Sequence, residues 1–199
     1  MAAVEFFFDC SSPWTYLAFE NINRLAAADG FDIDWKPILV GGVFNDANPS
    51  VYHNRMNPVP AKVAHQAKDL KDWADHTGIT IVWEPTFFPI NSVKAMRGCI
   101  VAGRQGKLVE HARAVFEAYW GEDQDITQEE VLGDICDRVG LDRDHYFAAI
   151  AEPEIKAELK ANTDELIGRG GFGSPTMFVG GGDMYFGNDR LPLVREAVR

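Results

Sequence analysis

Residues 8–15 read FDCSSPWT and join a short apolar run, VEFFF at 4–8, to the start of a helical pattern. Ser12 followed by Pro13 is a favoured pair for the N-cap and the first position of a helix. Apolar residues then recur at helical spacing until Gly30, which is typical of a helix end. The corner between strand and helix also holds a cysteine and two serines, so it is a candidate for a reactive site as well as a turn.

The segments around this corner predict an α/β fold with a mixed sheet. Residues 31–40, FDIDWKPILV, have strand character, so the chain opens as a strand–helix–strand unit with parallel strands. Near the other end, PTMFV at 175–179 and MYFG at 184–187 flank a glycine-rich turn and predict a β-hairpin. A short helix closes the chain, which gives the order βαβ…ββα around a helical middle.

The middle of the chain predicts mostly helices. Residues 41–60 are rich in Gly, Asn and Pro and predict a long loop, whereas ITIVW at 79–83 predicts a short strand-like piece between two helical patterns. We therefore expect one domain made of residues 1–45 and 169–199, with an all-helical subdomain, 46–168, inserted between its halves.

Composition narrows the classes of function. The 199 residues carry a formal net charge of −11, which disfavours nucleic acid and anionic membrane surfaces as partners because both attract clustered Lys and Arg. No stretch approaches the roughly 20 apolar residues of a spanning helix. The three cysteines include no Cys-x-x-Cys pair, so neither a disulfide framework nor a metal site is expected. We expect a reduced, soluble, cytoplasmic protein.

Most of the other motifs predict no chemistry. The five histidines form no ligand pair and lie in polar contexts, so we expect all of them to face solvent. No Gly-x-Ser-x-Gly elbow is present, which disfavours a serine hydrolase.

Two segments remain, and each has an ordinary alternative. A helix N-terminus at Ser12 would stabilise an anion such as a thiolate, although Ser12 could be an N-cap only. In GGFGSPTMF, residues 170–178, the bond from Ser174 to Pro175 is a candidate for the cis form, which would expose backbone groups to an extended peptide. The alternative there is an ordinary trans turn.

Three stretches together resemble one known family. FFFDCSSPWTYLAFE at 6–20, GFGSPTMFV at 171–179 and YFGNDRL at 185–191 are similar to the 2-hydroxychromene-2-carboxylate isomerases of the thioredoxin superfamily. These are relatives of kappa-class glutathione transferases and of DsbA-type disulfide oxidoreductases. The resemblance spans the chain and implies a thioredoxin-like fold, with a homodimer as the common assembly. It places Ser12 and Thr15 where the oxidoreductases carry two cysteines, so no redox dithiol is expected.

The resemblance also implies glutathione as the cofactor. Ser12 would be the catalytic residue, with its hydroxyl and the helix N-terminus holding the glutathione thiolate. Cys10 would then only pack at the strand end. The resemblance also implies that Ser174 and Pro175 bind the central peptide of glutathione. Its γ-glutamyl end would be bound by Phe186, Gly187, Asn188 and Asp189. The implied substrate-binding residues are Lys62 and Asn91. Lys62 could instead be an exposed helix residue, and Asn91 could be a helix cap.

The implied reaction is isomerisation of 2-hydroxychromene-2-carboxylate, or a similar small aromatic carboxylate of aromatic hydrocarbon catabolism. The thiolate would add reversibly to the conjugated system, allow rotation about the resulting single bond, and leave. The alternative is a kappa-like glutathione transferase or detoxification enzyme with another electrophile. A non-catalytic binding or chaperone module is a third reading, which the retained glutathione-binding residues disfavour. The 41–60 loop, with Asn48, Asn54 and Asn57, would shape the substrate pocket.

Overall fold

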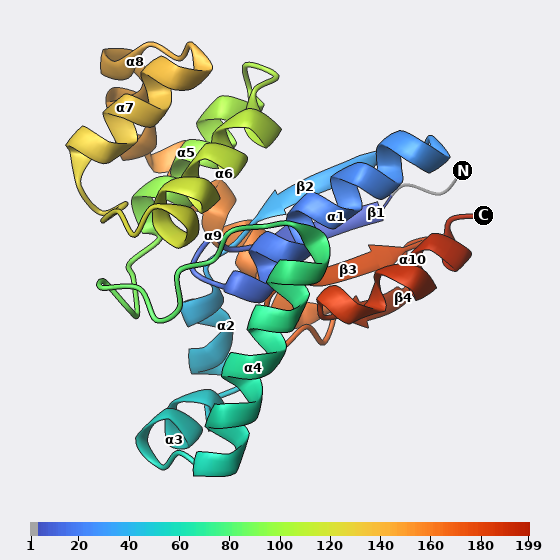
Figure 1. Cartoon of the computed structure of the whole chain (residues 1–199). Coiled ribbons are helices and arrows are strands. Elements are labelled where there is room, and N and C mark those ends of the chain that lie inside the picture. The colour runs from blue at the N-terminus through green and yellow to red at the C-terminus, as the bar shows by residue number, and fades with distance from the viewer. Residues whose placement is uncertain (1–3) are drawn as a thin grey trace.

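The structure is a computed structural model that describes residues 4–199 (Figure 1). Its strands are β1 Val4–Phe8, β2 Ile33–Pro37, β3 Thr176–Val179 and β4 Asp183–Phe186. Its α-helices are α1 Pro13–Asp29, α2 Val40–Asp46, α3 Ser50–Met56, α4 Pro60–Thr77, α5 Val93–Gly103, α6 Leu108–Phe116, α7 Glu129–Val139, α8 Arg143–Ala151, α9 Pro153–Gly168 and α10 Leu191–Ala197. A π-helical turn η1, Glu117–Gly121, extends α6, and a 3₁₀ turn η2, Asn188–Arg190, precedes α10. Within residues 4–199, no helix has both the length and the apolar character needed to cross a membrane.

The four strands form one mixed sheet in the order β2-β1-β3-β4. β1 runs parallel to β2 with Val4 opposite Ile33, and antiparallel to β3 with Val4 opposite Val179. β3 and β4 form the C-terminal hairpin. The predicted βαβ opening, the hairpin and the mixed sheet are therefore confirmed.

The alternation of side chains along β1 gives each face of the sheet its own core. Phe6 and Phe8 belong to the larger buried cluster, together with residues of α1 and α10. Phe7 points to the opposite face, where it packs with Phe178 of β3 and Leu166 of α9. Because both faces are covered by helices, β1 is apolar at nearly every position, as expected for a central strand.

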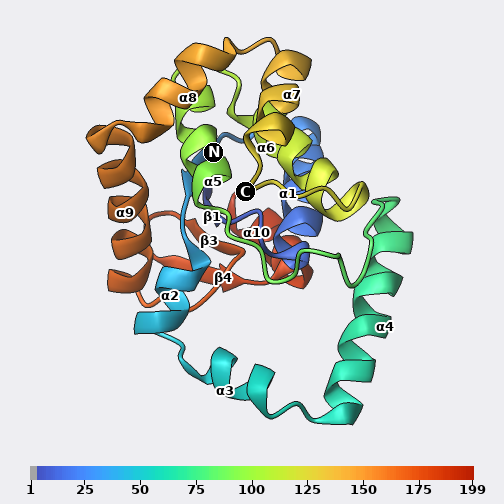
Figure 2. The same cartoon turned by 90° about the vertical axis from the view of Figure 1, so that its left-hand side faces the viewer.

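Most helices between β2 and β3 gather at two ends of the molecule, whereas α2 and α9 lie against the sheet (Figures 1 and 2). Helices α5–α8 lie at one end, whereas α3 and the first turns of α4 form an arm at the other end. Phe116 of α6 stacks on Tyr16 of α1 at 5.0 Å, so the helical segment shares the buried core of the sheet. The division into a domain of residues 1–45 and 169–199 and an inserted subdomain of residues 46–168 stays a prediction. Residues 1–3 of the first domain lie outside the described residues.

Two local predictions were wrong. Most of the expected 41–60 loop is helical, since α2 and α3 fill it. α2 forms because its Val43 is buried against the sheet. α3 is tied to α2 by its own Tyr52, whose hydroxyl donates to the Gly41 carbonyl at 3.3 Å. The ITIVW segment is not a strand, since none of the strands within residues 4–199 pairs with it. Its Val82 N–H donates instead to the Trp120 carbonyl at the end of η1.

The prediction that all five histidines face solvent was also wrong, because His111 is fully buried in α6. Its Nε2 lies 3.1 Å from the Tyr146 hydroxyl of α8, and its Nδ1 lies 3.6 Å from the Cys99 sulfur of α5. Burial lowers the pKa of His111 to about 4. The polar neighbours of this histidine in the sequence belong to the exposed face of the same helix, so local composition could not reveal its partners.

Gly98 of α5 allows Tyr146 to reach His111, and we expect Gly98→Ala to destabilise the protein. A Cβ at this position would overlap the Tyr146 hydroxyl and lie 2.6 Å from its Cζ atom. Overpacking of this kind costs about 1–3 kcal/mol, which exceeds the gain of up to about 1 kcal/mol from replacing a helical glycine by alanine. Urea unfolding measures the difference.

Gly168→Ala is the matched control, because Gly168 ends α9 with open space where its Cβ would lie. We expect that variant to be as stable as the wild type or slightly more stable. Equal stability of Gly98→Ala and the wild type would contradict the close approach of α5 and α8.

Candidate active site

Ser12 begins α1 as the sequence predicts. It is the N-cap residue in an extended conformation, and its Oγ accepts a hydrogen bond from the Thr15 N–H at 3.3 Å. Pro13 occupies the first helical turn and Gly30 ends the helix with φ 74°. Ser12 is partly exposed, so its hydroxyl lies at an accessible helix N-terminus, where the partial positive charge favours a bound anion.

The loop before β3 lies directly against this corner. The Ser174–Pro175 peptide bond is cis, as predicted. The Ser174 carbonyl accepts a long hydrogen bond from the Ser12 hydroxyl, at 3.4 Å, across 162 residues of sequence. The Ser174 side chain turns the other way, into the protein, where its Oγ lies 2.8 Å from the Thr15 Oγ1. Two segments that sequence analysis selected separately thus form one site.

Cys10 packs at the end of β1, as predicted. It is 1% exposed, and burial raises the pKa of its thiol well above the usual value. Its carbonyl accepts a hydrogen bond from the Trp120 indole at 2.8 Å, and its N–H contacts the Met96 sulfur at 3.3 Å. A buried thiol that resists ionisation is a poor nucleophile, so Cys10 is not the reactive group of this corner.

Asp9 is a buried acid at the site whose role the sequence did not reveal. It is 1% exposed; one carboxylate oxygen accepts the Ser11 N–H at 2.9 Å and the other accepts the Val40 N–H at 2.8 Å. Burial raises the pKa of Asp9, while these hydrogen bonds act in the opposite direction. The carboxylate therefore joins the corner to the first residue of α2. The signal for this role in the sequence was a single acidic residue, Asp9, directly after an apolar strand.

The residues predicted to hold the γ-glutamyl end lie next to the cis-proline loop. The Gly187 N–H donates to the Pro175 carbonyl at 3.2 Å, and Gly187 has φ 103°, a conformation that favours glycine. Asn188 is buried, and its Oδ1 has no hydrogen-bond partner within residues 4–199. Asp189 is exposed and forms an ion pair with Arg190. An unpaired buried acceptor beside an exposed carboxylate suits a ligand that brings several N–H donors.

Phe186 contributes an apolar wall to the same region. It is exposed by 39%, and its ring lies 4.5 Å from that of Phe172, which is also exposed. A Cβ on Gly173 would lie 2.8 Å from the Phe186 ring, so the loop before Ser174 packs closely under it.

The two predicted substrate residues are not joined to this cluster. Lys62 is exposed in the first turn of α4, and no ion pair or hydrogen bond of its side chain occurs within residues 4–199. Asn91 is exposed and precedes Ser92, the N-cap residue of α5, and its Oδ1 accepts the Val93 N–H at 3.1 Å. No hydrogen bond connects either residue to Ser12 in the described part of the chain.

Arg55 is a second exposed cation on the arm, which sequence analysis missed. Its guanidinium lies 5.9 Å from the Phe44 ring of α2 and 5.6 Å from the Phe88 ring of the turn before α5. It therefore links α3 to that turn without an acidic partner in residues 4–199. Only the fold could reveal this position, because Arg55 and Phe88 are far apart in sequence.

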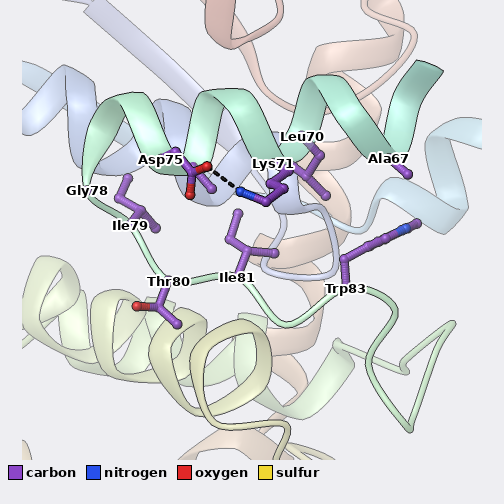
Figure 3. Close-up of a pocket in the computed structure, with 10 residues that line it drawn as sticks. Ala67, Leu70, Lys71, Asp75, Gly78, Ile79, Thr80, Ile81 and Trp83 are labelled. Atoms are coloured by element: carbon purple, nitrogen blue, oxygen red, sulfur yellow. Dashed lines mark hydrogen bonds and ion pairs between the residues drawn. The ribbon is translucent and has the colours of Figure 1, made fainter. Parts of the chain in front are cut away.

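A cavity of about 640 Å³ lies between α4 and the extended segment that follows it (Figure 3). Its lining combines aliphatic side chains with the ion pair of Lys71 and Asp75 (Ala67, Leu70, Lys71, Ala74, Asp75, Gly78, Ile79, Thr80, Ile81 and Trp83). The Trp83 indole stacks on Trp120 at 6.2 Å. Neither Ser12 nor Ser174 lines the cavity, so the cavity is separate from the hydrogen-bonded corner.

Comparisons with known proteins show the family of the chain. Residues 3–199 match the family model of the DSBA-like thioredoxin domain. The chain is 31% identical to a 2-hydroxychromene-2-carboxylate isomerase of Pseudomonas putida, over 98% of this chain and 93% of the relative. It is 27% identical to glutathione S-transferase kappa 1 of Homo sapiens, over 96% of this chain and 88% of the relative.

Solved structures show the same fold. A structure of a 2-hydroxychromene-2-carboxylate isomerase superposes with a TM-score of 0.82 at 28% identity, over 98% of this chain and 93% of that one. A probable DsbA oxidoreductase of Streptomyces coelicolor, at 16% identity and a TM-score of 0.78, supports the fold alone. The full-length relatives are isomerases and transferases, and the chain is accordingly an enzyme that belongs to the DSBA-like thioredoxin domain family.

Proposed function

We propose that the protein is a glutathione-dependent isomerase that acts on 2-hydroxychromene-2-carboxylate or a similar aromatic carboxylate. The observation that carries the proposal is the position of the Ser12 hydroxyl, which lies at the N-terminus of α1 and faces the Ser174 carbonyl beside cis-Pro175. The similarity to named isomerases over nearly the whole chain supports the same reaction.

In this proposal Ser12 stabilises a sulfur anion and is not itself the nucleophile. A free thiol has a pKa near 8.5 and is only a few per cent ionised at pH 7. Lowering that pKa by about two, which requires about 2.7 kcal/mol of differential stabilisation, makes the thiolate the major form. A hydrogen bond from the Ser12 hydroxyl and the partial positive charge of the helix N-terminus are suitable sources of this stabilisation.

The neighbouring segments would hold the rest of glutathione. The Ser174 backbone beside Pro175 offers its polar groups to the central peptide. The Asn188 amide oxygen and the Asp189 carboxylate are acceptors for the α-ammonium group at the γ-glutamyl end. Phe186 and Gly187 would line the same end of the glutathione site.

The substrate would lie on the side of the arm. Its carboxylate needs a cation in a chain of net charge −11, and Lys62 is our candidate, with Arg55 as a second exposed cation on the same arm. Asn91, at the start of α5, would contact the aromatic part.

The chemistry conserves atoms and electrons. The cyclic hemiketal of 2-hydroxychromene-2-carboxylate opens first: its ring C–O bond breaks, the ring oxygen takes up the proton of the 2-hydroxyl and becomes a phenol, and the 2-hydroxyl oxygen becomes a carbonyl. The thiolate then adds to the far carbon of the conjugated double bond, and the π-electron pair moves onto the carbonyl oxygen as an enolate. The former double bond is then single and rotates. Re-formation of the carbonyl restores the double bond and expels the thiolate, so the product is an isomer and glutathione is unchanged.

A kappa-like transferase or detoxification enzyme is the second candidate, because kappa transferases are also full-length relatives. The same glutathione site would serve both reactions, and only the substrate side would differ. In either case we propose a cytoplasmic homodimer; the isomerase would work in aromatic hydrocarbon catabolism.

Two assays in the presence of glutathione distinguish these reactions. We expect 2-hydroxychromene-2-carboxylate to be isomerised, measured by the change in its absorption spectrum, and no turnover without glutathione. Conjugation of an electrophilic aryl halide is the competing assay. Activity on the halide alone would contradict the isomerase proposal, and a protein that neither binds glutathione nor turns over either compound would contradict both enzymes.

A further inference from the structure

Ser12, Thr15 and Ser174 form a closed ring of hydrogen bonds at the corner. The Ser12 hydroxyl donates to the Ser174 carbonyl at 3.4 Å, and the Thr15 N–H donates to the Ser12 Oγ at 3.3 Å. The Thr15 and Ser174 hydroxyls close the ring at 2.8 Å. The shortest link of the ring is therefore the one between the two buried hydroxyls.

This hydroxyl pair fixes the direction of the Ser174 carbonyl. Thr15 is fully buried, and in residues 4–199 its hydroxyl has the Ser174 Oγ as its one side-chain partner. The Ser174 Oγ also accepts the Asp9 N–H at 3.0 Å, so the Ser174 side chain is held inward at two points. Because a buried hydroxyl without a partner is costly, the inward position is strongly favoured. With its side chain held inward, Ser174 presents its carbonyl to Ser12.

We propose that Thr15 is a positioning residue, which acts through the Ser174 hydroxyl to aim the Ser174 carbonyl and, through it, the hydroxyl of Ser12. This inference rests on the proposed function, since it concerns how Ser12 meets the glutathione sulfur. A structural role of Thr15 would affect folding alone, whereas a positioning role changes the ionisation of a bound thiol.

The ring also couples peptide binding to sulfur activation. Ser12 has a single hydroxyl proton, and without a ligand it is directed to the Ser174 carbonyl. At 3.4 Å this bond is at the weak end of hydrogen-bond geometry, so it is easily exchanged. When a peptide N–H of glutathione donates to the same carbonyl, the Ser12 proton becomes available to the adjacent thiolate. The Thr15–Ser174 pair keeps the carbonyl in place during the exchange.

Two variants of one residue test the inference. Thr15→Val keeps the shape and removes the hydroxyl, and Thr15→Ser restores it. The bound thiolate is titrated by its ultraviolet absorption near 240 nm, with glutathione in excess. We expect Thr15→Val to raise the pKa of bound glutathione by about 0.5–1, the equivalent of one ordinary hydrogen bond, and to lower kcat at pH 7 by about 1.5- to 3-fold. Thr15→Ser should return both values close to those of the wild type.

Ser174→Ala removes the same pair from the other side and leaves the carbonyl, so it substitutes for Thr15→Val if that variant does not fold. Ser174→Ala also removes the acceptor of the Asp9 N–H, so the double variant Thr15→Val, Ser174→Ala should lose no more than Ser174→Ala alone, which already breaks the link that Thr15→Val breaks. Urea unfolding of each variant records the structural cost separately.

The outcomes separate the two claims. If wild type shows the thiolate band and Thr15→Val titrates like wild type, the positioning role is wrong and the proposed function stands. A Thr15→Ser variant that behaves like Thr15→Val would also overturn the positioning role. If the wild type itself shows no thiolate band with glutathione, the proposed function is wrong, and the inference falls with it.

Discussion

Ser12→Ala is expected to lower isomerase turnover at pH 7 by about 3- to 25-fold at saturating glutathione, since bound glutathione starts from a pKa of about 6.5. A hydrogen bond to a charged group contributes about 1.5–3 kcal/mol, which corresponds to about one to two in the pKa of the bound thiol. Without the Ser12 hydroxyl, the helix N-terminus alone stabilises the thiolate, so a smaller share of bound glutathione is ionised. The pH profile of kcat should shift to higher pH by the same amount, and activity should recover partly at high pH.

The same substitution removes the N-cap of α1, so its structural effect must be measured too. Loss of the Thr15 N–H contact to Ser12 Oγ should cost about 1 kcal/mol in the free energy of unfolding. Ser11→Ala is the matched control, since its backbone keeps the N–H contact to Asp9 and its side chain takes no part in the contacts that join Ser12, Thr15 and Ser174. Turnover of Ser12→Ala at the level of Ser11→Ala would refute the assignment of Ser12.

The cysteines of the chain explain why this site would use a sulfur from a ligand. Cys10, Cys99 and Cys136 are all buried, and burial raises the pKa of each thiol. At pH 7 none of them is suited to form a thiolate. Ser12, by contrast, is partly exposed at a helix N-terminus and has a proton to donate. The proposed use of an external sulfur therefore fits a chain whose own three thiols are all buried.

The parts of the fold that sequence analysis predicted are those with local signals. Ser12-Pro13 marks a helix start by the backbone preferences of those two residues alone, and Gly30 marks its end in the same way. The glycine-rich turn between β3 and β4 likewise belongs to one short segment. The corner and the cis-proline loop could be selected separately, but their contact depends on the pairing of β1 with β3, which joins distant segments.

The parts that sequence analysis missed depend on partners from elsewhere in the chain. α3 has no buried residue of its own, so its helix is favoured by contacts such as the one from Tyr52 to Gly41 and not by an apolar face. Asp9 is a buried acid because the Val40 N–H lies opposite it, which local patterns do not show. The position of Arg55 over the Phe88 ring likewise depends on a contact between segments that are distant in sequence.

Between pH 8 and pH 5 the protein is expected to lose about 2 kcal/mol of its free energy of unfolding through His111 alone. In the unfolded chain histidine has a pKa near 6.5, whereas burial lowers the pKa of His111 to about 4 in the folded protein. As the pH falls through this window, the unfolded state takes up a proton that the folded state does not, so unfolding becomes easier. This contribution to stability is complete above pH 6.5 and is lost progressively down to pH 4.

Because surface carboxylates also affect acid stability, the test compares variants over the same pH range. His111→Gln keeps a group that can bond to the Tyr146 hydroxyl but cannot take up the proton, so its urea-unfolding free energy should fall by about 2 kcal/mol less than that of wild type between pH 8 and pH 5. His145→Gln, at an exposed position of α8, should keep the steep dependence of the wild type. Parallel curves for wild type and His111→Gln would mean that His111 is protonated in the folded protein. The Nε2 of a charged imidazolium would then donate to the Tyr146 hydroxyl, and the lowered pKa of the buried His111 would be refuted.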